Sequence, residues 1–358
     1  MAKTFATIIL ALLLLFPAAA QHIREEVPPA RRIGAGKDSL SISFIGDVMM
    51  HTRQLDYDCT RFLEHIGGSL RDADIAVANM EFTLAGKPYS GYPAFSAPDE
   101  YAESIFNDSG VDVFLCANNH ILDKGRTGLE RTLKVYDRMG VRYCGAFADS
   151  LHQARNSPLM FAAKGILIAL VNFTYGTNNP YRGGYPGVSL MRKEEVGKAI
   201  REARRRGADF VIALPHWGEE YRLTHNSTQE SWAGWLVEQG VDAIVGCHPH
   251  VVQDSCSIAG VPVFYSTGNC VSNMSAVNTR LGLMVTLNFT VDTTSGEKKM
   301  LAPDIRFTWC TLPGTLEDSY RTIFIDEWEG RRSSWRRASD YDEMMSTLAR
   351  VKAATGIK

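Results

Sequence analysis

The sequence lacks the features that mark several large classes of protein. Its 38 basic and 40 acidic residues give a net charge of −2, so no excess of positive charge points to nucleic acid. Beyond the first twenty residues, no apolar run approaches the ~20 residues that a membrane-spanning helix needs. The seven cysteines are odd in number and include no CxxC pair, and those inside apolar runs, Cys116, Cys144 and Cys247, are expected to be buried thiols. An exported chain can form one disulfide, but the spacing does not identify which two cysteines would pair.

The first twenty residues are typical of a secretory signal peptide. Lys3 precedes an unbroken apolar stretch, Ile8–Phe16, which is followed by a proline and three alanines. The stretch is short for an uncleaved membrane anchor, the alternative interpretation, so we expect cleavage near Ala20 and Gln21. No cysteine lies at that point to carry a lipid. We therefore expect an exported chain, periplasmic or associated with the cell envelope, with a flexible linker over residues 21–38.

Five apolar runs later in the chain each stop at polar side chains. Each run is short and bounded by turn signals, as buried parallel strands are. Ligands of open α/β sheets bind beyond the carboxyl ends of such strands, so we expect five strand ends of one sheet to converge. Carboxylates, amide oxygens and imidazoles suit one or two divalent metal ions. The residues at the ends of the five runs are Asp47; Asn79 and Glu81; Asn118, Asn119 and His120; His216 and Glu219; and His248 and His250.

The remaining pattern predicts an α/β fold. A glycine follows each of three predicted helices and precedes an apolar run, at Gly110, Gly207 and Gly240, where it supplies the left-handed residue that ends a helix. Later segments, between residues 159 and 311, read as antiparallel strand pairs. The helices are expected at Asp99–Phe106, Thr127–Met139, Lys193–Arg206, Thr228–Glu238 and, on the outside, Asp340–Ala354.

The third cluster packs two amides, an imidazole and a carboxylate into six residues, from Asn118 to Asp123. An amide oxygen there can bind a metal ion, and the adjacent His120 is then better placed to reach a substrate as a general acid. Asp123 is spaced to hold the imidazole. The alternative is structural, since two asparagines after a strand also form a simple turn.

The fifth cluster, Gly246–Val251, is the most specific. Two histidines two positions apart on an extended segment present both rings to one side, and Pro249 fixes the backbone between them. A lone buried histidine is usually satisfied by a backbone carbonyl. Here four of the nine histidines fall at strand ends of one apparent sheet, which favours a shared site.

Six ordered motifs between Leu40 and Ser272 together resemble the CapA family, the capsule-synthesis proteins linked to poly-γ-glutamate, which are similar to calcineurin-like metallophosphoesterases. The resemblance implies an α/β metallophosphatase-like four-layer sandwich, two mixed β-sheets flanked by α-helices, with a metal site at one end. The motifs are Gly46-Asp47-Val-Met, Asn79-Met-Glu81, Asn119-His120-Ile-Leu-Asp123-Lys-Gly125, His216-Trp217-Gly218-Glu219-Glu220-Tyr221, Gly246-Cys-His248-Pro-His250-Val and Tyr265-Ser-Thr-Gly268-Asn269.

The resemblance also implies roles for single residues. Asp47 and His250 would hold one divalent ion, with Glu81 between the two ions and His120 as the acid beside the scissile bond. The ligands of the second ion would be Asn119, His216 and His248. The metal would be Mn, Zn or Fe, one or two ions per chain.

This chain departs from the phosphoesterase pattern at two motifs. Met49 stands where these enzymes usually carry a histidine two residues after the first aspartate, and His51 is out of register for that position. The second motif is Asn79-x-Glu81 in place of Gly-Asp. Both departures alter the first metal site, so phosphoester hydrolysis is not assumed.

Two long loops rich in Tyr, Asn, Pro and Gly, at residues 89–98 and 175–187, are either substrate-shaping segments or plain surface loops. We expect the substrate-binding residues to be Asn79, Tyr181, Glu220 and Asn269.

The sequence thus predicts an exported, metal-dependent protein of capsule or extracellular-polymer synthesis or processing, acting by metal-activated hydrolysis on an anionic polymer, peptide or glycan at the cell envelope. The alternative is a non-catalytic component of a capsule-synthesis membrane complex, with a structural or vestigial metal site. The expected layout is a signal peptide (1–20), a linker (21–38), a CapA-like domain (39–315) and a charged segment with a helix packed on it (316–358).

Overall fold

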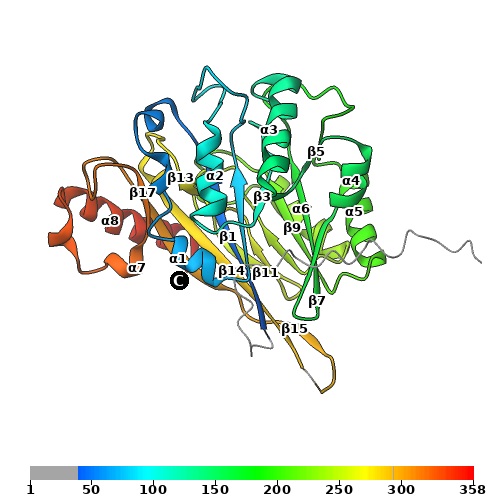
Figure 1. Cartoon of the computed structure of the whole chain (residues 1–358). Helices are drawn as coiled ribbons and strands as arrows, with labels where there is room; N and C mark the ends of the chain where they lie inside the picture. Colours follow the sequence, from blue (N-terminus) through cyan, green and yellow to red (C-terminus); the bar gives the residue numbers. More distant parts are fainter. Residues whose placement is uncertain (1–38, 293) are drawn as a thin grey trace, which may run out of the picture.

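Two β-sheets face each other and helices cover their outer faces, in the computed structural model of residues 39–292 and 294–358 (Figure 1). The predicted signal peptide and linker lie outside the described residues. The layer order, helix–sheet–sheet–helix, confirms the four-layer metallophosphatase-like sandwich expected from the sequence.

The larger sheet has nine strands. Its β1, β2, β3 and β4 run parallel, and β14, β16 and β17 continue the sheet antiparallel from β1. Three helices, α1, α2 and α3, share the apolar cluster on its outer face. The strand bounds are β1 Ser39–Val48, β2 Ile75–Met80, β3 Val113–Leu115, β4 Arg142–Cys144, β13 Asn269–Val271, β14 Leu281–Val291, β15 Lys298–Met300, β16 Asp304–Thr311 and β17 Arg321–Phe324, and the helices are α1 Gly67–Asp72, α2 Asp99–Asn107 and α3 Gly125–Met139.

The second sheet has six strands, of which β7, β9, β10 and β12 run parallel. Helices α5 and α6 pack on its outer face, and β5 and β8 form a separate two-stranded ladder. The bounds are β6 Leu159–Ala163, β7 Ile166–Thr174, β9 Phe210–His216, β10 Ala243–Val245, β11 Ser255–Ile258, β12 Val261–Phe264, β5 Ala146–Phe147, β8 Gly187–Val188, α4 Ser150–Asn156, α5 Lys193–Arg205, α6 Ser227–Glu238, α7 Ile325–Trp328 and α8 Ala338–Thr355.

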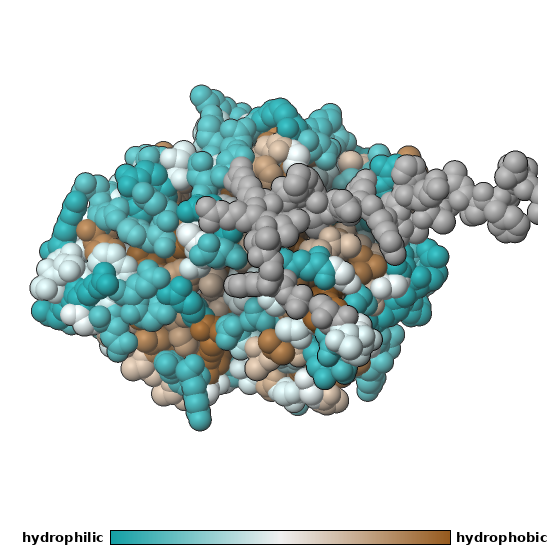
Figure 2. Space-filling view, turned by 60° about the horizontal axis from the view of Figure 1, so that its bottom comes forward, coloured by the Kyte–Doolittle hydropathy of each residue, from teal (hydrophilic) through white to brown (hydrophobic). Residues whose placement is uncertain are grey.

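The core between the sheets is a single apolar layer. Phe44 and Val77 of the larger sheet share a buried cluster with Leu170 and Ile212 of the smaller one, and α8 adds Met344 to the same cluster. Because strand side chains alternate, the opposite faces of both sheets are free to bury apolar residues against helices. On the side of the molecule seen in Figure 2, hydrophilic residues cover most of the coloured surface and apolar residues show in smaller patches between them.

The predicted helices and their glycine stops are confirmed, but the prediction of one sheet was wrong. Gly110, Gly207 and Gly240 have φ near +85°, +85° and +87°, as a helix end requires. The five apolar runs, however, are divided between the two sheets. Apolar runs identify buried strands, whereas the sheet that each strand joins depends on contacts distant in sequence.

The charged segment 324–339 is more ordered than a solvated surface run. It forms α7 and a 3-10 turn, Arg332–Ser334, and buries Trp335. Its arginines are used within the protein, since Arg332 pairs with Asp342 and Arg336 with Asp318.

All seven cysteines are free thiols, and Cys116, Cys144 and Cys247 are buried as expected. Burial raises the pKa of each of these three thiols, which makes them poor nucleophiles. Among the described residues, no helix combines the length and apolar character needed to cross a membrane.

Strand β1 approaches the backbone of Gly268 so closely that only glycine fits at position 46. A Cβ on Gly46 would overlap the Gly268 carbonyl oxygen, next to Asp47. Gly46→Ala is therefore expected to lower the free energy of unfolding by about 1–3 kcal/mol or more. Gly234→Ala in α6, where a Cβ would contact nothing within 4 Å, should instead raise it by about 0.5–1 kcal/mol. Urea denaturation of both variants measures the contrast, and equal effects would contradict it.

Candidate metal centre

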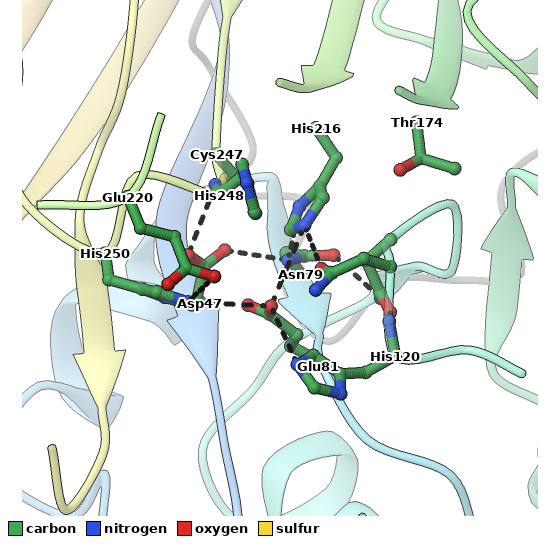
Figure 3. A network of polar contacts seen from close by, with 12 residues as sticks. Asp47, Asn79, Glu81, His120, Thr174, His216, Glu220, Cys247, His248 and His250 are labelled. Atoms are coloured by element: carbon green, nitrogen blue, oxygen red, sulfur yellow. Dashed lines mark hydrogen bonds and ion pairs between the residues drawn. The ribbon is translucent and has the colours of Figure 1, made fainter. Parts of the chain in front are cut away.

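The polar strand ends of both sheets meet at one place, at the seam between the sheets (Figure 3). The larger sheet contributes carboxylates and amides, together with His120 after β3. The smaller sheet contributes imidazoles, from His216 at the end of β9 and from two histidines after β10. The convergence that the sequence predicted is therefore present, although it joins two sheets. The residues brought together are Asp47, Asn79, Glu81, Asn119, His120, His216, Glu220, His248 and His250.

Glu81 lies at the centre of the cluster. Its Oε1 is 3.7 Å from His216 Nε2, 3.9 Å from His250 Nε2 and 4.0 Å from His120 Nε2. The side chain is 0% exposed, and neither carboxylate oxygen has a hydrogen-bond partner. A buried carboxylate without a partner is costly, so the arrangement calls for a cation that the protein itself does not supply.

The donor set fits a divalent metal ion. Three groups of three side chains place their ligand atoms within 4.8 Å of one another: Glu81, His216 and His248; Asp47, Glu81 and His250; and Glu220, His248 and His250. Imidazole with carboxylate is the ligand mixture of zinc, manganese and iron sites. The Nδ1 of His248 is buried and also lacks a hydrogen-bond partner, which adds a second unsatisfied donor atom to the cluster.

Amide side chains make hydrogen bonds to the candidate ligands and orient them. Asn79 Nδ2 donates to Asp47 Oδ1 at 2.7 Å, and Asn118 Nδ2 lies 3.2 Å from Asn79 Oδ1. Asn269 Oδ1 is 3.0 Å from His250 Nδ1, which leaves the Nε2 of that ring toward Glu81. Asn79 and Asn269 are both at most 1% exposed. Their side chains bond to Asp47 and His250 and so orient candidate ligands, and the substrate contact expected of them stays a prediction.

Without a bound cation, burial favours the uncharged forms of three central groups, Glu81, His216 and His248. Burial raises the pKa of Glu81 well above its usual range, and the charges of Asp47 and Glu220 raise it further. Burial lowers the pKa of His216 well below its usual range and that of His248 to about 3, in both cases assisted by a neighbouring histidine. For His250, burial lowers the pKa, but the bond to Asp47, the charges of Asp47 and Glu220 and the bond to Asn269 together outweigh burial, so the pKa is raised. Neutral imidazole is the form that binds metal.

His120 and Asp123 form a tight pair beside the cluster. Their Nδ1 and Oδ2 atoms are 2.6 Å apart, and the same Oδ2 accepts the backbone N–H of Phe95 at 2.8 Å. The Phe95 ring packs edge-on against the imidazole at 4.6 Å. These contacts fix the orientation of His120 and direct its Nε2 toward Glu81. The spacing of the third cluster therefore predicted a real contact.

The two long loops both reach this pair. Phe95 belongs to the first loop, and in the second Asn178 Nδ2 lies 3.2 Å from His120 Nδ1. Tyr175 lies beside His248, with ring centroids 4.6 Å apart, and sequence reasoning did not single it out. The signal for Tyr175 was its position directly after the apolar run of β7, a sixth strand end of the same kind.

Of the predicted substrate contacts, Glu220 borders the cluster and Tyr181 does not. The Tyr181 hydroxyl donates to Gly184 of its own loop at 2.7 Å, next to a cavity of about 260 Å³ that Leu122 and Arg126 also line. Glu220 is 43% exposed in its side chain and lies 4.0 Å from His250 Nε2.

The His248–His250 segment is not extended, contrary to the prediction. His248 and His250 have φ of +100° and +60°, a conformation that costs a non-glycine residue about 1–3 kcal/mol. Both rings nevertheless reach the cluster, with centroids 5.9 Å apart. Such strain is common in ligand-holding segments, and here it turns both side chains inward.

Comparison with known sequences identifies the family. A sequence profile described as "Bacterial capsule synthesis protein PGA_cap" matches residues 41–274, well over half of the chain. The chain belongs to this family. The matched region contains every residue of the metal cluster, so the cluster lies within the part of the chain that defines the family.

Two relatives of this PGA_cap protein have names that concern the biosynthesis of a capsule or of PGA. It is 27% identical over 298 residues to "Capsule biosynthesis protein CapA" of Bacillus anthracis, covering 78% of this chain and 71% of the relative. It is 30% identical over 259 residues to "PGA biosynthesis protein CapA" of Bacillus subtilis, covering 69% and 67%. Among solved structures, a putative 5'-nucleotidase from Staphylococcus aureus is similar with a TM-score of 0.51 and 13% identity, over 75% of this chain and 54% of that one. That likeness concerns the fold alone.

Proposed function

We propose that this protein is an exported, metal-dependent hydrolase that acts on a surface polymer of the poly-γ-glutamate type. The observation that carries the proposal is the buried carboxylate of Glu81, unpartnered among three imidazoles, with the His120–Asp123 pair beside it. A structural protein gains nothing from leaving this carboxylate without a partner. The names of the Bacillus relatives supply the polymer context.

In this proposal one set of residues binds the metal and His120 transfers the proton. Asp47, Glu81 and His250, with Asn119, His216 and His248, would hold one or two divalent ions of Mn, Zn or Fe. When bound, such an ion lowers the pKa of water toward ~7 and so supplies a nucleophile. His120 would hold the proton for the leaving group on Nε2, because Asp123 fixes its Nδ1 side.

A second candidate function is a non-catalytic part of a capsule-synthesis membrane complex, in which a metal ion only stabilises the fold or the metal site is vestigial. Met49 favours this alternative, since the position that would carry a metal-binding histidine instead buries its side chain in the apolar core. Under this alternative the ligand residues matter for stability, and His120 is dispensable.

The first test is metal content. We expect the mature protein, purified without chelator, to contain about one or two Mn, Zn or Fe ions per chain, because the buried donor set needs a cation. Inductively coupled plasma mass spectrometry measures the content directly. A metal-free protein that takes up none of these ions on addition would rule out the metal-dependent hydrolase and leave the non-catalytic alternative with a vestigial site.

The substrate test follows once the protein is loaded with metal. A γ-glutamyl polymer, a generic phosphodiester and a peptidoglycan-derived stem peptide are the substrates to compare. The proposal requires turnover of the γ-glutamyl polymer by the loaded protein and none by the chelator-treated protein. Loaded protein that cleaves none of the three would favour the structural role.

Export is part of the proposal and has its own test. The mature amino terminus is expected near Gln21, because small residues at positions 18 and 20 precede it. Amino-terminal sequencing of protein recovered from the cell envelope would decide between cleavage and an intact Met1, which would indicate an anchor.

A further inference from the structure

One half of the metal centre is short of ligands. Asp47, Glu81 and His250 offer three ligand atoms within 4.8 Å of one another. Zinc commonly takes four ligands, and manganese takes more. Met49 adds none, because its side chain lies in the apolar core and its backbone carbonyl accepts bonds from Gln54 and Tyr101.

Glu220 lies on the open side of this half. Its Oε1 is 4.0 Å from His250 Nε2, and its ligand atom lies within 4.8 Å of those of His248 and His250. Figure 3 shows its carboxylate above His250, directed toward the group that contains Asp47 and Glu81. Among the described residues, Glu220 forms an ion pair with His250 and with no lysine or arginine. The adjacent Glu219 instead bonds Asn226 and pairs with Arg222 at the surface.

A turn in the backbone after β9 places Glu220 beside the cluster. After β9 ends at His216, Gly218 turns with φ of +95°, and a Cβ there would lie 2.7 Å from the Gln229 amide. Tyr221 has φ of +66°, and its N–H donates to the Pro249 carbonyl at 2.8 Å. The turn that carries Glu220 is therefore tied directly to the segment between the two histidines.

We infer that Glu220 is a metal ligand at the half-site of Asp47, Glu81 and His250. It adds a carboxylate next to His250, the residue that this group shares with the group of Glu220, His248 and His250, where Met49 provides no histidine. This inference rests on the proposed metal-dependent function. Because the other ligands of the half-site are at most 2% exposed and Glu220 is 43% exposed, it is also the ligand next to solvent, where an ion enters.

The test compares Glu220→Gln with Glu219→Gln, a matched change one residue away on the same turn. Both proteins and the wild type are stripped with chelator and titrated with Mn²⁺ or Zn²⁺ by isothermal calorimetry, and bound metal is counted by mass spectrometry. We expect Glu220→Gln to lose one ion or to bind it at least tenfold more weakly, with Glu219→Gln equal to the wild type. Glu220→His should recover binding, since an imidazole replaces the carboxylate, and it also guards against a variant that simply misfolds.

The outcomes separate the inference from the function on which it rests. Glu220→Gln that binds metal as the wild type does, even with turnover lost, would overturn the inference and return Glu220 to the role of a substrate contact. Equal weakening in both variants would overturn it as well, because a general loss of surface charge would explain the result. A wild type that binds no ion would overturn the proposed function and the inference together.

Discussion

His120→Ala is expected to lower turnover of the metal-loaded protein by roughly 10²–10⁴-fold and to leave its metal content near that of the wild type. The reason is geometric. His120 Nδ1 is held 2.6 Å from Asp123 Oδ2, and its Nε2 is directed toward the cluster but is not needed to satisfy it. Steady-state kinetics on the best substrate of the three-way comparison, with metal analysis of the same samples, measures both quantities.

Asp123→Asn is the companion variant. An asparagine keeps an acceptor for the Phe95 N–H but no longer stabilises a charged imidazole, so a smaller loss of turnover is expected with unchanged metal content. Turnover by His120→Ala equal to the wild type would exclude the general-acid role. If His120→Ala also supported capsule formation in cells, the structural alternative would be preferred.

His250→Ala is expected to lose metal and activity together, because it removes a ligand atom that belongs to two of the three candidate groups. The wild type should gain about 2.7 kcal/mol in unfolding free energy at a metal concentration one hundred times Kd, and the variant should gain much less. His248→Ala should behave in the same way. Thermal unfolding with and without added ion measures the difference.

His65→Ala provides the control for this series. His65 Nε2 lies 2.7 Å from Glu317 Oε1, and neither residue belongs to the cluster. The loss of His65 should therefore change neither metal content nor the stabilisation by metal. A His250→Ala protein that is stabilised by the ion as fully as His65→Ala would contradict the ligand assignment.

Sequence patterns predicted those parts of the structure that depend on local chemistry. Gly110, Gly207 and Gly240 were correctly predicted as helix ends because a left-handed residue there favours glycine. The six-residue spacing of the third cluster predicted the His120–Asp123 contact, because both residues lie on one short segment.

The errors concern backbone and pairing that depend on distant parts of the chain. The extended conformation predicted for His248 and His250 ignored the neighbouring turn, whose Tyr221 N–H holds the carbonyl of Pro249 between them. The assignment of the five strand ends to one sheet failed because an apolar run says nothing about its partner strand. Tyr175 was not predicted as a site residue because it follows β7, a sixth strand end that was not among the five apolar runs.

The division of the ligands between the two sheets gives a bound ion a further effect, on the lifetime of the folded chain. Asp47 and His248 are 201 positions apart in the sequence, so an ion that holds both halves of the centre closes a very long loop. In the chain-entropy model, closing a loop of this length with a cross-link contributes on the order of 5 kcal/mol. Because such an ion would join the two sheets, their separation would require its release, and metal supply would then govern how long the protein resists proteases.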